Sequence, residues 1–405
     1  MDLNPDSMRK NGDKDGSVDF FYQMPTVCKL WYDVMAMSPK YWTKVTIFVD
    51  EDPTPLSDLE ACLRNSRELP ITVRVGRRDS LKLDGEEGRR TRGVMDILKP
   101  HIHRCTEIVF QVIHGSSLPA VSVDLQDISS ALTELHLECE HDDGAPSIEA
   151  VMHGEPRRIK SKLDLNAITL HGHTILDVLK NDDDLDIFSR DCTNLQFGNF
   201  DTSNYDEEDV VSILPAFFSA LSSQRGETFA GVSKMSLPYE AFDSRRHRCA
   251  PRQMALTFDH LSNDCIRLLM ENLDFSLTGN LAIGDCALED ISITGADALC
   301  LWGVSGDLEH VLSEWMGSDL FVNECHGFTD DVLSLFGECH GLRCLNIMNC
   351  ENFSVKGLQH MVKARHSTII GPEFTRIFVS DERNLSKRER DWFRSQDFGF
   401  NWTTK

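Results

Sequence analysis

Histidine, cysteine and aspartate side chains stand at metal-binding spacings in two short stretches of the sequence. His101, His103 and Cys105 alternate, so on a strand they would point the same way, as the ligands of one metal ion do. The acidic run 182–186 has carboxylates at three alternating positions of a calcium loop, but Ile187 stands where that loop needs glycine. We therefore predict no metal site: the first stretch is interpreted as a helix-to-strand junction and the second as a solvated loop.

Sequence motifs for phosphate binding and hydrolytic chemistry are also missing. The sequence contains no GxG phosphate loop and no HExxH motif. The stretch GVSG, residues 303–306, misses the GxSxG nucleophile motif by one position. Because no nucleophile, base and oxyanion donor can be assembled, we predict a protein without catalytic activity and without a cofactor.

The charge balance argues against nucleic-acid and membrane partners. The chain has 405 residues, with 41 basic against 65 acidic side chains, and its formal net charge of −24 repels phosphate groups and anionic lipids. The most basic stretch, residues 76–93, interleaves acidic residues, so we expect a loop there. No apolar run is long enough to span a membrane, and the 13 cysteines include no CxxC pair. These features predict a soluble protein of the cytoplasm or nucleus with reduced thiols.

A repeated phrase near the C-terminus indicates how the chain is organised. The segments CHGFTDDVL, starting at Cys325, and CENFSVKGL, starting at Cys350, place Cys, Phe and Leu at identical intervals, 25 residues apart. This period is within the range of leucine-rich repeats.

The strand of such a repeat has apolar residues at positions 1, 4 and 6. Nine segments of the sequence fit this pattern, and a further unit is expected near either Leu256 or Leu281, between which the spacing does not choose. The nine fourth-position residues are Ile108, Leu135, Ile168, Leu195, Met235, Ile291, Leu320, Leu345 and Ile377. We predict an α/β fold, an irregular leucine-rich-repeat-like solenoid with one strand and one helix per repeat. A two-layer α/β domain is the alternative.

In a solenoid of this kind the strands line a concave face, and side chains at positions 3, 5 and 7 point outward along it. Such a row is a candidate surface for binding a protein partner. Phe321 and Phe378 are the candidate aromatic anchors, or alternatively lie buried under a loop or the C-terminal helix. The complete candidate set is Glu134, His136, Glu138, His171, Asp290, Asp319, Phe321, Asn323, Asn346, Arg376 and Phe378.

The aromatic-rich stretch VCKLWYDVMAMSPKYW, residues 27–42, predicts a helix followed directly by a strand. Helical spacing places Val27, Leu30 and Trp31 on one face, and Pro39 ends the helix. Trp42 then opens the pattern of the first strand. We expect the two tryptophans to pack the helix onto that strand.

This stretch resembles the second half of an F-box, which reads VCxxWxxLAxxPxLW. The matching residues are Val27, Cys28, Trp31, Pro39 and Trp42, with Leu30 in the same helix. The first half of that motif, LPxEILxxIF, has no counterpart here. Together with LEACLRNSRELPITVRV, residues 59–75, and NCENFSVKGLQHMVKAR, residues 349–365, the stretch is similar to F-box-like proteins of mushroom-forming fungi.

The resemblance implies that residues 27–42 dock onto the Skp-type linker of a cullin-based ubiquitin ligase while the repeats hold a protein substrate. The alternative is a repeat scaffold that binds a protein partner without any ubiquitin ligase. We expect a leader over residues 1–19, an F-box-like segment over 20–48, the repeat array over 49–380, and a capping helix with a tail over 381–405. Outside such a complex the chain is expected to be a monomer.

Overall fold

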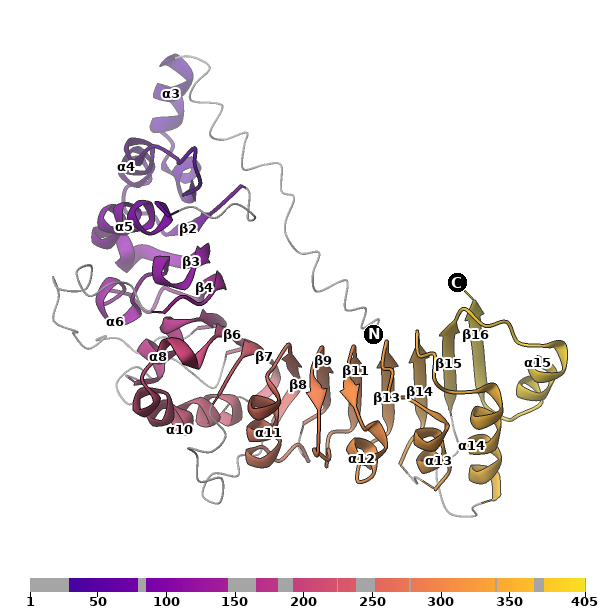
Figure 1. Ribbon diagram of the computed structural model, residues 1–405. Coiled ribbons are helices and arrows are strands. Elements are labelled where there is room, and N and C mark those ends of the chain that lie inside the picture. Colours follow the sequence, from indigo (N-terminus) through magenta and orange to yellow (C-terminus); the bar gives the residue numbers. More distant parts are fainter. Residues whose placement is uncertain are drawn as a thin grey trace.

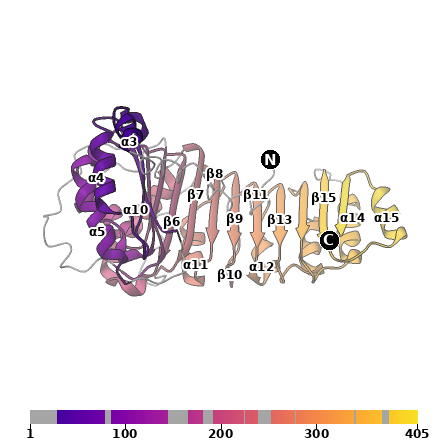
Figure 2. The same cartoon turned by 90° about the horizontal axis from the view of Figure 1, so that it is seen from above.

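One long parallel sheet runs through the computed structural model of this protein (Figures 1 and 2). The structure describes residues 29–78, 85–144, 165–180, 192–223, 225–237, 252–276, 278–338, 341–367 and 375–404. The sheet has 14 strands, and each strand pairs with the strand before and after it in chain order. The fold is therefore mixed α/β, as the sequence predicts.

The strands are short and separated mostly by helices. The strands of the long sheet are β1 (Lys44–Phe48), β2 (Ile71–Gly76), β3 (Cys105–His114), β4 (Glu134–His141), β5 (Ala167–His171), β6 (Asn194–Phe200), β7 (Arg225–Met235), β8 (Arg252–Asp259), β9 (Asn280–Gly284), β11 (Ala298–Trp302), β13 (Asp319–Asn323), β14 (Cys344–Met348), β15 (Arg376–Asp381) and β16 (Gly399–Thr404). Two further short strands, β10 (Ala287–Leu288) and β12 (Ser305–Gly306), pair with each other.

The helices lie on one face of the sheet, and the row of strands bends so that its other face is concave (Figure 1). The α-helices are α3 (Lys29–Ala36), α4 (Leu56–Asn65), α5 (Glu87–Leu98), α6 (Val121–Asp124), α8 (His173–Lys180), α10 (Glu207–Ser223), α11 (Asn263–Asn272), α12 (Leu308–Leu312), α13 (Asp330–Glu338), α14 (Val355–Ser367) and α15 (Lys387–Arg394). The short 3₁₀ helices are η1 (Pro39–Trp42), η2 (Lys99–Arg104), η3 (Gly115–Ser117) and η4 (Thr202–Asn204).

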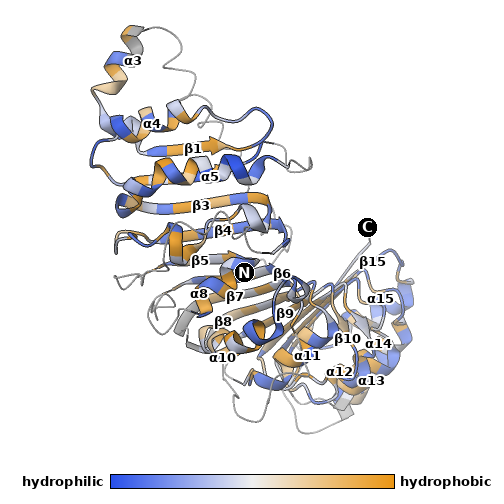
Figure 3. Ribbon diagram, turned by 60° about the vertical axis from the view of Figure 1, so that its left-hand side comes forward, coloured by the Kyte–Doolittle hydropathy of each residue, from blue (hydrophilic) through white to orange (hydrophobic). Residues whose placement is uncertain are grey.

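The core lies between the sheet and these helices, and strand register builds it from the repeated pattern. Val73, Ile108, Leu135 and Ile168 align across β2 to β5, and all four are fully buried. Alternate residues point to the concave face and stay partly exposed, because side chains alternate along a strand. Helices α4 and α5 accordingly carry both hydrophobic and hydrophilic stretches (Figure 3).

The predicted repeat positions are correct at both ends of the sheet and wrong in the middle. Met235 was expected at position 4 of a repeat, but Ala230 pairs with Leu195 there. Ile291 was expected on a strand, but it lies in the chain between β10 and β11, where its buried side chain packs into the core. The strands of this region are β8, β9 and β11, so Leu256 and Leu281 both belong to strands.

The predicted boundaries also differ from the observed ones. The sheet already begins with β1, within the segment expected to be F-box-like, and it continues to β16, within the expected tail. The stretch 76–93 was expected to be a loop, but its last part forms α5. Burial of Val94, Met95 and Leu98 along one face of α5 stabilises that helix despite its arginines.

The two ends of the sheet are covered as the sequence predicts. At the C-terminal end Ser386 and Glu389 form the reciprocal bonds of a capping box that begins α15. The ring of Phe393 then stacks on that of Phe400 in β16, with centroids 4.1 Å apart. At the N-terminal end Trp42 is buried, and its indole N–H donates to the carbonyl of Met35 at 2.9 Å. The side chain of Trp31 is outside the described part.

In the long sheet, each strand from β5 to β14 has a left-handed residue at its end, either just after the strand or, in β6 and β7, as its next-to-last residue. The left-handed conformation turns the chain sharply away from the sheet, and glycine, asparagine and aspartate tolerate it best. The residues in this position are Gly172, Asn199, Lys234, His260, Asp285, Gly303, Glu324 and Asn349. Because consecutive strands are parallel, these turns all lie along one edge of the sheet, which we call the strand-end rim.

Candidate partner-binding surfaces

An exposed apolar surface lies at the N-terminal end of the sheet. Leu30 and Val34 of α3 are 71% and 48% exposed, and Met37 and Tyr41 beside them are 73% and 45% exposed. The sequence predicted that Trp31 and Trp42 pack this helix onto the first strand; Trp42 is buried, whereas Leu30, placed on the helix face of Trp31, is exposed. The helix instead packs through Met35, which is 7% exposed, and its opposite side faces solvent. Val27, which was assigned to the face of Leu30, and Cys28, which matches the F-box pattern, are outside the described residues.

The first half of the concave face is polar and internally paired. Arg74 on β2 donates to Glu107 on β3 at 3.0 Å. Glu138 accepts from a glutamine on β3 at 3.2 Å, and His136 Nδ1 lies 2.9 Å from the hydroxyl of Thr169. A carboxylate oxygen of Glu134 lies 3.7 Å from His136 Nε2. The predicted row is therefore on the concave face, but its polar groups already bind one another.

His171 does not offer a free imidazole to a partner. Its Nδ1 lies 3.0 Å from the carbonyl oxygen of Cys139, and its ring covers Gly198, where a Cβ atom would stand 2.9 Å from Nε2. Burial lowers the pKa of His171 below its ordinary value, against the smaller opposing effect of the bond to Cys139. We conclude that this residue, predicted as a binding residue, is a neutral part of the packing.

The second half of the concave face, from β9 to β15, carries more apolar side chains. Phe321 and Phe378 are half-buried and flank Asn346 in one row across β13, β14 and β15. Trp302 lies on β11 in the next row, paired with Asn323. Its indole covers Gly284 of β9, so closely that a Cβ atom there would be 1.9 Å from the ring. Apolar side chains that remain accessible on a concave sheet are suited to anchor a partner.

Of the other residues predicted to bind a partner in this half of the sheet, some lie on the concave face and others lie outside it. Asp319 and Arg376 lie in one row on either side of β14, with Asp319 accepting from Ser318 at 2.5 Å and Arg376 exposed. Asn323 accepts from Asn349 at 2.8 Å on the strand-end rim. Asp290 was expected on a strand, but it has a left-handed backbone in the chain between β10 and β11, so it does not belong to the concave rows.

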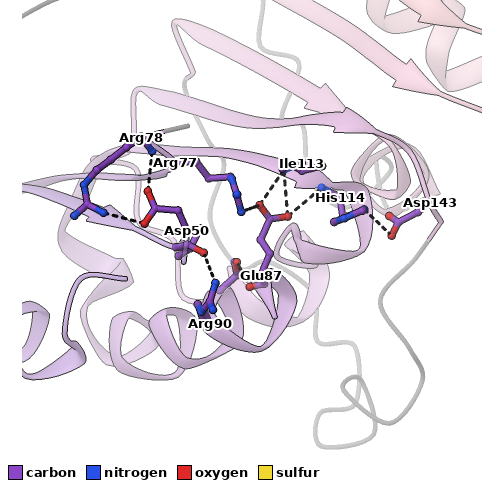
Figure 4. Close-up of polar contacts among 10 residues, drawn as sticks. Asp50, Arg77, Arg78, Glu87, Arg90, Ile113, His114 and Asp143 are labelled. Carbon is purple, nitrogen blue, oxygen red and sulfur yellow. Dashed lines mark hydrogen bonds and ion pairs between the residues drawn. The ribbon is translucent and has the colours of Figure 1, made fainter. Parts of the chain in front are cut away.

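Buried carboxylates hold the first turns of the strand-end rim together (Figure 4). Glu87 of α5 accepts from the backbone N–H groups of Ile113 and His114 at 3.0–3.1 Å, and it pairs with Arg77 at 3.2 Å. Asp50, after β1, accepts from both the backbone and the side chain of an arginine that follows β2. These groups are satisfied by the fold itself, so we interpret them as structural.

The described residues give little support to catalysis by a thiol. The cysteines of the described ranges are free thiols, most of them buried. Burial raises the pKa of Cys62 to about 11 and that of Cys350 to about 12, so the thiolate that nucleophilic chemistry needs is disfavoured. Cys105 is also buried and begins β3, while His101 and His103 lie on η2, so this stretch is the helix-to-strand junction that the sequence predicts.

Two features escaped the sequence analysis. Trp302 was missed although its strand has two buried apolar residues, Leu299 and Leu301, as the predicted strands β13 and β14 do. Within the described ranges, three side chains that could bind a metal ion lie close together on the strand-end rim, at the ends of β8 and β9: Asp259, His260 and Asp285. The signal in the sequence for Trp302 was the glycine that follows it, Gly303. For the metal-donor group it was the aspartate at or just after the end of the strand.

No helix in the described part of the chain is both long and apolar enough to cross a membrane. No protein-family model matches the sequence, and no curated protein matches it either.

Proposed function

We propose that this protein is a non-catalytic adaptor: a leucine-rich-repeat-like solenoid whose concave face holds a protein substrate and whose N-terminal end docks onto the Skp-type linker of a cullin-based ubiquitin ligase. The solenoid interpretation is supported by strands that pair in chain order and by a similar left-handed turn after most of them.

The observation that carries the docking proposal is the apolar surface at the N-terminal end. Leu30, Val34, Met37 and Tyr41 are all at least 45% exposed, although Trp42 beside them is buried. Clustered apolar side chains that face water are costly unless they are covered by a partner. They lie in the segment that resembles the second half of an F-box, which is where a linker would bind.

The substrate is assigned to the second half of the concave face. There Trp302, Phe321 and Phe378 offer aromatic side chains that are partly accessible. In the first half the polar side chains already pair with one another, so a partner would have to break those contacts. A protein substrate with an exposed apolar segment fits this division best.

Co-purification with a Skp-type linker tests the docking proposal, with Met37→Glu as the disrupting variant. Met316→Glu is the matched control, because Met316 is 60% exposed against 73% for Met37 and lies next to β13, far along the sheet. We expect wild type and Met316→Glu to retain the linker and Met37→Glu to lose it. Failure of wild type to bind any Skp-type linker would remove the ubiquitin ligase from the proposal.

The second candidate function is a repeat scaffold that binds a protein partner without a ubiquitin ligase. It is favoured by one observation, the partly accessible aromatic residues of the concave face, which can bind a partner without a linker. For this function, binding of the partner depends on the concave aromatic residues and is unchanged in Met37→Glu.

A further inference from the structure

A histidine stands between two carboxylates on the strand-end rim. His260 Nδ1 lies 3.0 Å from Asp259 Oδ1, and its Nε2 lies 3.6 Å from Asp285 Oδ2. One donor atom from each of these residues lies within 4.8 Å of the other two. His260 and Asp285 occupy the same place in consecutive turns, after β8 and β9, so the fold brings together residues distant in sequence.

The backbone fixes this arrangement. The N–H of His260 donates to the carbonyl of Gly284 at 3.0 Å, and the N–H of Asp285 donates to that of Trp302 at 2.9 Å. The next turn has Gly303, where a Cβ atom would stand only 2.2 Å from Asp285 Oδ1. The glycine therefore leaves the space that the carboxylate of Asp285 occupies.

The polar groups of this cluster do not satisfy one another. Asp259 Oδ1 is buried and receives no hydrogen bond, because the neighbouring imidazole lacks the alignment that one requires. Each ring nitrogen of His260 faces a carboxylate oxygen, and a ring nitrogen without a proton can bind a metal ion through its lone pair. The arrangement leaves negative charge and lone pairs converging on one place, and a bound cation would relieve that repulsion.

We propose that Asp259, His260 and Asp285 bind one divalent metal ion of the zinc class. An imidazole nitrogen with two carboxylate oxygens is a donor set that suits Zn²⁺. Ca²⁺ requires six to eight oxygen ligands, and Mg²⁺ retains most of its water and avoids nitrogen, so both fit less well. The ion joins the turns after β8 and β9.

The side chains of His260 and Asp285 are 41% and 42% exposed, so water or a ligand from another molecule can complete the coordination of the ion. This inference is independent of the adaptor function, because it rests on the rim alone and involves none of the residues assigned to linker docking.

Titration of the metal-free full chain with ZnCl₂, followed by calorimetry, tests the site. His260→Gln and Asp285→Asn remove one donor each with little change in size, and His310→Gln is the control, since His310 is an exposed histidine on α12. We expect one Zn²⁺ per chain in wild type and in the control, and at least tenfold weaker binding in both site variants. Equal binding in all four proteins, or none in wild type, would overturn the proposal.

A second measurement covers variants that fail to fold. Acylation of His260 by diethylpyrocarbonate is followed in wild type by mass spectrometry, with and without ZnCl₂. Protection of His260 together with continued modification of His310 supports the site. Equal modification of His260 under both conditions contradicts it, whatever the variants do.

Discussion

Replacing Glu87 by glutamine tests whether the strand-end rim is held by buried charge. The side chain of Glu87 is 1% exposed and that of its partner Arg77 is 4% exposed. The Glu87→Gln change keeps the volume of the side chain, so no cavity forms. It removes the charge opposite Arg77. It also places an NH₂ group next to the backbone N–H groups of Ile113 and His114, which in wild type donate to the carboxylate at 3.0–3.1 Å.

The expected loss is large because buried Arg77 loses the opposite charge and one of the two oxygens that accept from the backbone is replaced by a donor. Breaking one side of a buried ion pair costs about 3–5 kcal/mol, whereas an exposed pair is worth about 0–1 kcal/mol. The exposed comparison is Glu107→Gln, since Arg74, the partner of Glu107, is 56% exposed. We expect Glu87→Gln to lower the free energy of unfolding by about 3–5 kcal/mol and Glu107→Gln by less than about 1 kcal/mol.

Urea denaturation followed by circular dichroism measures both changes, and hydrogen exchange locates them. In a stack where each strand contacts only its neighbours, the loss is concentrated near β3, so the amides of Ile113 and His114 should exchange faster in Glu87→Gln. If Glu87→Gln and Glu107→Gln are equally stable, the buried carboxylate does not hold the rim and the reasoning is refuted.

Two further predictions concern the packing around His171. Gly198→Ala places a Cβ atom 2.9 Å from both His171 Nε2 and the hydroxyl of Ser233, so thermal unfolding should show a loss of about 1–3 kcal/mol. Gly231→Ala, whose nearest neighbour would be at 3.8 Å, should be near neutral, and equal effects would contradict the packing. Burial also lowers the pKa of His171 and His173, so their contribution to stability is complete above pH 6.5 and is lost as pH falls below it. Urea titrations at several pH values should show a slope of at most about 1.4 kcal/mol per pH unit per histidine, reduced in His173→Gln; an unchanged slope would assign the effect elsewhere.

The sequence predicts the fold well where each strand has strong apolar residues. Leu345 and Ile347 mark β14 unambiguously, and both are fully buried. In the middle, Ala230 stands where a large apolar residue was expected, so the pattern was assigned to Met235 instead. Met235 is also buried, which shows that burial and strand position are separate properties of an apolar residue.

The candidate surfaces are predictable only in part. The concave rows follow from strand alternation, and the structure places Glu134, Phe321 and Phe378 in them. Whether a polar side chain in a row is available depends on the neighbouring strand, as with His136 and Thr169, and no local pattern contains that information. The exposure of Leu30 likewise depends on which helix face packs, and helical spacing alone does not contain that information.

The pairing of each strand with its chain neighbours has a mechanical consequence. Among the described residues, most contacts between strands join neighbours in the row, so a small change in twist at each pair adds up along the row. The curvature of the row should therefore increase or decrease while the hydrogen bonding of each strand pair is kept. The apolar half of the concave face can in this way fit partners of different diameter, because the deformation energy is divided among many strand pairs.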